Sequence, residues 1–477
     1  MSTTTTPQKD MTAVGFRSER GPILIALMLT SSLVALDSTI IATAVPSVVK
    51  SLGGFSEFPW LFSIYLLAQA VSVPIYSKVA DMFGRKPVML LGIALFLVGS
   101  ILCGVAWSMP ALIAFRALQG LGAGAVQPMG ITIVGDIYTL EERARVQGYL
   151  ASVWGISSVV GPTLGGVFSE YISWRWIFFV NIPMCVLAGA MLMRKFHEKV
   201  TPKPHRIDYS GATLLTVGCS LLILGLLEGG NSWGWASPVS IAIFVVGVLA
   251  LIAFVLVERK AAEPVLPLWI FRRRVLVGGS IVALSVGAVL LGLTSYVPTY
   301  AQVVLHASPL IAGFALATMT LGWPIAAAYS GRLYLRFGFR MTALVGGLVA
   351  VVGTALMMTL DAHSSLWAVG AYCFIIGLGL GLVASPTLIA AQSSVGWEDR
   401  AVVTGTNLFS RSIGSAVGVA LFGAIANGVI ASSGFADESA GALSPASHAV
   451  FVAVALLCVA MAAAVLLLPR QRDQVVV

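Results

Sequence analysis

One carboxylate stands alone in a long apolar stretch near the start of the chain. The run from Gly21 to Val49 holds a single charged residue, Asp37, within LVALDSTIIATAVPSVV. A charge in such a stretch is costly and therefore points to function. Burial opposes the ionisation of a carboxyl group and a nearby arginine favours it, so this group can exchange a proton as its surroundings change. The alternative is a structural carboxylate that hydrogen-bonds Ser38, Thr39 or a neighbouring helix.

Two arginines also lie within apolar stretches. Arg116 opens RALQGLGAGAVQP (116–128), whose glycines let a neighbouring backbone approach closely. Arg411 lies in NLFSRSIGSAVG (407–418), one turn after Asn407 on a common helix face. A buried arginine without a partner is costly, so each is expected to face a partner or a polar cavity. Arg116 is the candidate neighbour of Asp37, although a purely structural role is open for both arginines.

These charges require surrounding helices that span a membrane. The chain has 477 residues, of which 58% are hydrophobic and 10% charged, whereas soluble domains carry about 25% charged residues. Apolar runs of bilayer-crossing length recur throughout, which predicts an all-α integral membrane protein with fourteen transmembrane helices. Their predicted ranges are 22–49, 59–80, 88–107, 110–136, 145–168, 175–194, 210–228, 238–257, 276–302, 309–331, 341–360, 366–391, 402–430 and 449–469.

The basic residues indicate how the helices are oriented. The net charge is +8, yet of 28 lysines and arginines only Lys50 and Arg175 are expected outside, and Arg116 and Arg411 lie within helices. The others fall on one side, which by the positive-inside rule places both termini in the cytoplasm. The basic excess therefore reports topology, and no nucleic-acid partner is expected. We expect no cleavable signal peptide in residues 1–20, and no disulfide or metal site from the five cysteines.

Two blocks of six helices repeat each other. SKVADMFGRK (77–86) and ERARVQG (142–148) return as GRLYLRFGFR (331–340) and DRAVVTG (399–405), shifted by 254 and 257 residues. A duplicated six-helix unit with an inserted helix pair explains both matches, and repeated halves place a substrate pathway at their interface. The stretch PVLPLWIFRRR after the inserted pair is either a short helix on the membrane surface or a loop with aromatic anchors. The expected parts are a cytoplasmic tail at 1–20, a bundle at 21–195, a linker with two helices and this interfacial segment at 196–274, a bundle at 275–469 and a tail at 470–477.

The loop after the second helix carries a family resemblance. SKVADMFGRK resembles the signature G-x-L-x-D-R-x-G-R-R/K of the major facilitator superfamily, and the chain as a whole resembles its fourteen-span drug–proton antiporter branch. Asp81, Arg85 and Lys86 match the signature, whereas Ser77 replaces a glycine. An aspartate at a helix end can meet the N-terminus of a neighbouring helix, and the basic pair can meet a carboxylate such as Asp136. The resemblance implies that Asp81, Arg85, Lys86 and Asp136 close the cytoplasmic side as a gate.

The fifth helix resembles the antiporter signature of that branch. The residues of GYLASVWGISSVVGPTLGG (148–166) that correspond to the signature are Gly148, Ser157 in place of a glycine, Gly161, Pro162, Gly165 and Gly166. Such a sequence predicts a kinked helix with a bare face on which the opposite half packs and rocks. The signature implies an exporter. RALQGLGAGAVQP resembles the helix 4 motif of proton-coupled members, and LDSTIIATAVPSVV resembles the helix 1 motif of the fourteen-span branch. The resemblance implies that Asp37 and Arg116 couple transport to protons.

Several polar or aromatic residues fall where a central cavity is expected. A tyrosine or tryptophan in a helix more often packs or anchors than contacts a ligand, so these positions are weaker candidates than the charges. The candidate residues of the substrate cavity are Tyr65, Gln69, Gln119, Trp154, Asn407 and Arg411.

The expected function is export of amphiphilic, cationic drugs or dyes by alternating access, with protons as the coupling ion and no other cofactor. The alternative is the same chemistry on an endogenous lipid, a metabolite or a self-made antibiotic. No enzyme is expected, because intramembrane His, Cys and carboxylate groups do not cluster, and no G-x-x-x-x-G-K-[ST] loop supports ATP-driven pumping. The expected partners are the bilayer and a small amphiphilic substrate. Nothing in the sequence demands more than a monomer, and by resemblance the chain is expected in a bacterial inner or plasma membrane.

Overall fold

The computed structural model of the chain describes residues 15–53, 60–198, 208–229, 233–261, 264–307, 309–433 and 440–468. Within these ranges, 14 helical segments are long and apolar enough to cross a membrane. The predicted all-α membrane fold is therefore confirmed. The parts of the expected tails at 1–14 and 470–477 lie outside the described residues.

The helices follow one another along the chain in three groups. The N-terminal bundle contains α1 (Gly21–Leu52), α2 (Trp60–Phe83), α3 (Arg85–Gly104), α4 (Met109–Ile137), α5 (Leu140–Val167), α6 (Trp176–Phe179) and α7 (Asn181–Lys195). The inserted pair is α8 (Tyr209–Glu228) and α9 (Pro238–Glu258). The C-terminal bundle contains α10 (Arg274–Val303), α11 (Pro309–Phe337), α12 (Phe339–Met357), α13 (Leu366–Ser393), α14 (Arg400–Ser433) and α15 (Ala440–Ala464).

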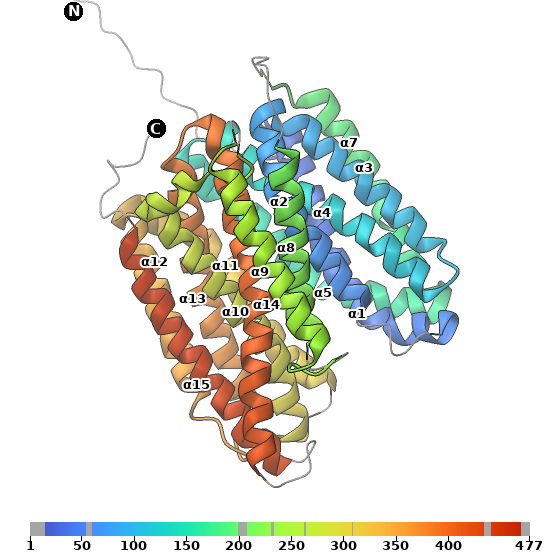
Figure 1. The fold of residues 1–477 in the computed structure, drawn as a ribbon, viewed down its shortest axis with the longest axis vertical. Coiled ribbons are helices and arrows are strands. Elements are labelled where there is room, and N and C mark those ends of the chain that lie inside the picture. The colour runs from blue at the N-terminus through green and yellow to red at the C-terminus, as the bar shows by residue number, and fades with distance from the viewer. Residues whose placement is uncertain are drawn as a thin grey trace, which may run out of the picture.

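The two bundles are built alike. In the first, α1 packs on α5 and α4 packs on both α2 and α3; in the second, α10 packs on α14 and α13 packs on both α11 and α12. The two bundles lie close together at one end and diverge toward the other (Figure 1). Helices α8 and α9 pack together, and α8 contacts both α2 and α14. The inserted pair therefore lies where the two bundles meet.

Helix ends differ from the hydropathy ranges where capping decides them. Helix α5 begins at Leu140 because Thr139 and Glu142 form a reciprocal capping box. The sixth span is divided at Val180 into α6 and α7, because Pro183 has no N–H to donate to the carbonyl of Phe179. Hydropathy predicts only the part of a helix that lies in lipid. Backbone hydrogen bonds extend several helices beyond their predicted hydropathy ranges.

The repeated motif builds the same turn twice. Gly84 between α2 and α3 and Gly338 between α11 and α12 both adopt positive φ angles, of 100° and 83°. Side chains with a Cβ rarely adopt this conformation, so a glycine is needed at each turn. The turn geometry thus supports the duplication inferred from the sequence.

The bundles touch through small residues on two equivalent helix pairs, α5 with α11 and α2 with α14. A Cβ added to Gly331 of α11 would lie 2.1 Å from the Cβ of Ala144 on α5. A Cβ added to Gly405 of α14 would lie 2.1 Å from Oγ of Ser77 on α2. Ser77 occupies the position in the first motif that Gly331 occupies in the second. Because Ser77 is larger than glycine, the close approach of α2 and α14 depends on Gly405 of α14.

Gly331→Ala is expected to destabilise the chain by about 1–3 kcal/mol, because the new methyl group overlaps Ala144 and forces α5 and α11 apart. The midpoint of thermal unfolding in detergent measures this loss. Gly313→Ala is the matched control, since Gly313 lies on the same helix with no atom within 4 Å of an added Cβ. Equal midpoints for the two variants would show that α5 and α11 do not need this close approach.

The stretch after α9 contains a short helix that is partly packed into the protein. It forms a short 3₁₀ helix at Leu268–Arg272, with Ile270 buried. The Arg273 guanidinium lies 4.8 Å from the Trp269 ring and donates to the carbonyl of Ser394 at 3.1 Å. The segment therefore connects the inserted pair to the C-terminal bundle.

Candidate functional site

Asp37 and Arg116 form an ion pair inside the N-terminal bundle. The Arg116 guanidinium donates to Oδ2 of Asp37 at 2.6 Å, and each residue is only 1% exposed. Arg116 also donates to the carbonyl of Leu61 at 3.1 Å and lies 4.2 Å from the ring centre of Tyr65. The two intramembrane charges of this bundle thus compensate each other.

Further polar side chains surround the pair. Gln119 donates to Asp37 Oδ1 and to Ser100 Oγ, both at 2.9 Å, and accepts from Arg116 at 2.7 Å. Asn181 of α7 donates to the same Ser100 hydroxyl at 3.4 Å. Five helices therefore contribute to one group of side chains, called here the buried polar cluster: Asp37, Tyr65, Ser100, Arg116, Gln119 and Asn181.

The hydroxyl groups beside Asp37 do not bond to it. Ser38 donates to the carbonyl of Ala35, and Thr39 donates to carbonyls of its own helix and to that of Ser157 on α5. The charged and amide groups of α4 therefore hold Asp37. Of the structural alternatives, the bond to a neighbouring helix is present, and bonds to Ser38 or Thr39 are not.

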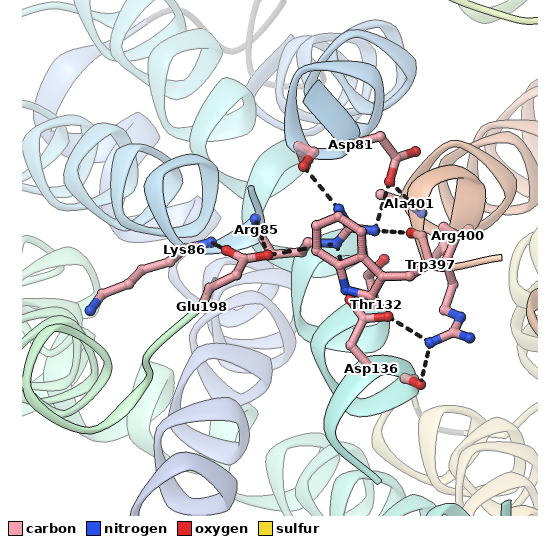
Figure 2. Close-up of polar contacts among 12 residues, drawn as sticks. Asp81, Arg85, Lys86, Thr132, Asp136, Glu198, Trp397, Arg400 and Ala401 are labelled. Carbon is pink, nitrogen blue, oxygen red and sulfur yellow. Dashed lines mark hydrogen bonds and ion pairs between the residues drawn. The ribbon is translucent and has the colours of Figure 1, made fainter. Parts of the chain in front are cut away.

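A second charged group joins the two bundles where they meet. Arg85 pairs with Asp81 at 2.8 Å and with Asp136 at 3.0 Å, inside the N-terminal bundle. Its guanidinium also lies 3.8 Å from the Trp397 ring centre and donates to the Trp397 carbonyl, across the interface (Figure 2). A planar guanidinium with several N–H groups can make all these contacts at once.

The carboxylates of this group reach the start of α14. Asp81 accepts the backbone N–H groups of Ala401 and Val402, at 3.1 and 2.7 Å. These are free donors at a helix N-terminus, where a negative charge is stabilised. Asp136 pairs with Arg400 at 2.7 Å (Figure 2). Asp81, Arg85, Asp136, Trp397 and Arg400 are called here the latch.

Lys86 lies beside the latch, and the contact of its side chain stays within the N-terminal bundle. Its ammonium group donates to the carbonyl of Met193 on α7, at 2.9 Å. Glu198 accepts the backbone N–H groups of Arg85 and Lys86, both at 3.0 Å. Within the described residues, the side chain of Lys86 thus supports its own bundle, and only Asp81, Arg85 and Asp136 of the expected gate reach the other one.

The second copy of the motif, residues 331–340, makes different contacts at the end of α11. Leu335 occupies the repeat position of Asp81, and Phe339 that of Arg85. Phe339 is buried and stacks on Tyr334 with ring centres 5.0 Å apart. Tyr334 in turn donates to the carbonyl of Leu140 at 3.3 Å. The first copy therefore contacts the other bundle through charged groups, whereas the second contacts it through the hydroxyl group of Tyr334.

A cavity of about 420 Å³ lies between the bundles. Its lining comes from α1, α4 and α5 on one side and from α10, α11, α13 and α14 on the other. Ile131 lines it five residues before Asp136 on α4, so the latch lies just beyond one end of the cavity. The space has the size and mixed lining of a small-molecule site.

The expected cavity residues divide into two groups. Trp154, Asn407 and Arg411 line the cavity, and Gln69 donates at 2.7 Å to Gln127, which also lines it. Tyr65 and Gln119 lie in the buried polar cluster instead, because both pack against Arg116. The structure therefore links these two residues to the ion pair and not to the described cavity lining.

The antiporter motif on α5 contacts both bundles. A Cβ on Gly148 would lie 3.4 Å from Ala328 of α11, whereas a Cβ on Gly161 would lie 2.0 Å from Thr39 Oγ1 of α1. Ser157 and Gly165 are buried, whereas a Cβ added to Gly166 would meet no atom within 4 Å. Helix α5 continues through residue 162. The motif therefore contacts the opposite bundle at Gly148, near the start of α5. At Gly161, farther along the helix, it packs against α1 of its own bundle.

Some residues of these sites were not singled out from the sequence. Arg400 belongs to the repeated motif DRAVVTG, and Asn181 is a polar residue within the predicted helix 175–194, so a signal existed for both. Trp397 and Glu198 act mainly through contacts that depend on the folded arrangement. No local pattern marks them.

Comparisons with known proteins agree with this architecture. The human organic anion transporter MFSD10 (TETRAN) superposes with a TM-score of 0.65, covering 94% of this chain and 99% of its own, at 15% identity. This likeness concerns the fold alone.

Sequence relatives extend the agreement. Multidrug transporter protein MdtP of Bacillus subtilis (strain 168) is 34% identical over 87% of this chain and 77% of its own length. Multidrug resistance protein 3 of the same organism is 34% identical over 85% of this chain and 80% of its own. Efflux pump dotC of Dothistroma septosporum (strain NZE10 / CBS 128990) is 34% identical over 83% and 70%. The family described as Major Facilitator Superfamily matches residues 27–419, which confirms the resemblance, and the chain belongs to that superfamily.

Proposed function

We propose that the chain is a proton-coupled antiporter that exports drug-like amphiphilic compounds by alternating access. Relatives named as multidrug transporters and efflux pumps support the substrate type. The cavity supports a small organic substrate, and because both of its sides come from one chain, we propose that a monomer is sufficient.

The position of the ion pair carries the proton coupling. Asp37 lies one turn after Val34, which lines the cavity, and Arg116 shares α4 with Gln127, which also lines it. Protonation of Asp37 removes the charge that holds Arg116, so it weakens the attachment of α1 to α4. A change at the buried polar cluster is thereby transmitted to the cavity wall.

This mechanism differs from direct competition between proton and substrate. In direct competition, Asp37 would hold a cationic substrate itself and release it on taking up a proton. Asp37 is absent from the described cavity lining and is already paired with Arg116. We therefore propose that the proton acts through the packing of α1 against α4.

The closed latch defines the state of the transporter. We propose that the latch end faces the cytoplasm of a bacterial cell, because the basic residues cluster there. Arg20 supports one terminus at that end, since it pairs at 3.0 Å with Glu142 at the start of α5. In this orientation the structure is closed to the cytoplasm, as a state that releases substrate outward must be.

The test uses proteoliposomes under an imposed pH gradient, with fluorescent amphiphiles that include ethidium, a neutral dye and an anionic dye. Wild type is expected to move at least one dye only with the gradient. Asp37→Asn is expected to show no dye transport driven by the gradient. Asp37→Asn/Arg116→Gln is the second variant, because it lacks the proton site without leaving an unpaired buried charge.

The outcomes separate coupling from transport. Gradient-driven transport by the folded double variant would place proton coupling elsewhere. Equal dye movement with and without the gradient in wild type would replace antiport by facilitated diffusion.

A further inference from the structure

The cavity carries one charge, and it is positive. Arg411 is the only charged residue among the described residues that line it. The polar remainder includes Gln127, Gln147 and Asn407, while two tryptophans and many aliphatic side chains supply apolar surface. A permanently charged guanidinium therefore sets the sign of the field that a bound substrate meets.

Arg411 has no hydrogen bond or ion pair to any residue that the structure describes. Arg116 and Arg85, by contrast, each bond to a carboxylate and to backbone carbonyls. The backbone at Arg411 is fixed, because its carbonyl packs within 2.0 Å of the place where a Cβ on Gly287 would lie. A fixed helix thus presents an uncompensated donor group to the cavity.

Aromatic side chains line the cavity from both bundles. Trp154 of α5 and Trp323 of α11 both line the cavity, and Trp154 is 36% exposed. An apolar or aromatic body can pack on these rings while an acceptor group reaches Arg411 from the same space. Asn407, one turn from Arg411, donates to the carbonyl of Gly279 at 3.1 Å and so stays in place beside it.

From this arrangement we propose that the cavity selects amphiphilic organic acids, whose carboxylate or similar anionic group binds Arg411 and whose apolar body packs on the tryptophans. The proposal rests on the proposed function for the role of the cavity and names its substrate class. It replaces the cation preference expected from the sequence. A cation in the same place would meet repulsion from Arg411 without a carboxylate in the described lining to offset it.

Three probes with one fluorescent body test this assignment: pyrenebutyrate, pyrenebutanol and pyrenebutyl-trimethylammonium. Equilibrium binding to the protein in nanodiscs is measured at neutral pH by energy transfer from tryptophan, with empty nanodiscs to subtract lipid partitioning. Wild type is expected to bind the carboxylate about tenfold more tightly than the ammonium probe, as a charge-assisted hydrogen bond provides.

Variants assign the preference to one side chain. Arg411→Gln is expected to weaken carboxylate binding about tenfold and to leave pyrenebutanol unchanged. Arg411→Lys is expected to keep the order of the probes. Arg332→Gln is the matched control, because it removes one positive charge outside the described lining and should change none of the affinities.

Two results would overturn the proposal: tightest binding of the ammonium probe by wild type, or equal loss for all three probes in Arg411→Gln. Neither result depends on a gradient. A chain that binds the carboxylate through Arg411 but transports nothing would refute the proposed function alone, whereas gradient-driven transport with tightest ammonium binding would refute the substrate class alone.

Discussion

Asp37→Asn is expected to destabilise the folded chain by about 3–5 kcal/mol, because it leaves Arg116 charged and buried without its counter-ion. The remaining acceptors, the carbonyl of Leu61 and the side chain of Gln119, keep its hydrogen bonds but carry no full charge. A guanidinium cannot escape this cost by losing a proton. The loss is measured by titrating the unfolding of purified protein with sodium dodecyl sulfate.

Arg116→Gln is expected to cost less than Asp37→Asn. The carboxyl group that it leaves behind can take up a proton and become neutral, whereas the guanidinium cannot. The double variant Asp37→Asn/Arg116→Gln is expected to be more stable than Asp37→Asn by about 1–3 kcal/mol, the usual coupling between residues in contact. Strictly additive losses would mean that the two charges do not depend on each other.

The sequence made the charges of this site visible but not their full environment. Asp37 and Arg116 stand out because charged residues in apolar helices are rare and costly. Their pairing needs α1 and α4 side by side, which the sequence suggests only through the resemblance. Gln119, expected at the cavity, contacts the ion pair instead, because the direction in which a side chain leaves a buried helix depends on how that helix is rotated.

The latch shows the same division between local and tertiary information. The motif at residues 77–86 and its family resemblance predicted Asp81 and Arg85, and Asp136 was the carboxylate expected to meet the basic pair. Their partners on the other bundle are a carbonyl, a ring and the N–H groups at a helix start. Every helix has such groups, so only the assembled bundles show which of them are used.

The latch and the buried polar cluster act on the same helix. Asp136 closes one end of α4, and Arg116 lies farther along it within the bundle. In the proposed mechanism, substrate and proton therefore influence each other through α4 without touching. Such coupling requires that the latch contacts exist in one state and not in the other, because only differential contacts shift a conformational equilibrium.

Arg85→Gln is expected to shift the equilibrium toward an open latch by at least about thirtyfold. The variant loses a charge-assisted hydrogen bond and a cation–π contact to Trp397, both of which cross the interface. Its bonds to Asp81 and Asp136 lie inside one bundle, so their loss affects both states and contributes less. The free energy of unfolding is therefore expected to change by a different amount from the free-energy difference between the closed and open states.

Spin labels at residues 83 and 337 measure this shift. Phe83 and Phe337 are repeat-equivalent positions at the ends of α2 and α11, and they are 47% and 53% exposed. The five native cysteines are buried, so labels attach mainly to the cysteines introduced by Phe83→Cys and Phe337→Cys. Arg85→Gln is expected to add a longer distance to the distribution measured by pulsed electron resonance.

Lys86→Gln is the matched control for this experiment. It removes the same charge one residue away, but the ammonium of Lys86 bonds only to Met193 among the described residues, within its own bundle. The distance distribution of this variant is expected to equal that of wild type. A longer distance in both variants would assign the closure to the total positive charge of the turn, whereas a change in Arg85→Gln alone assigns it to the contacts with Trp397.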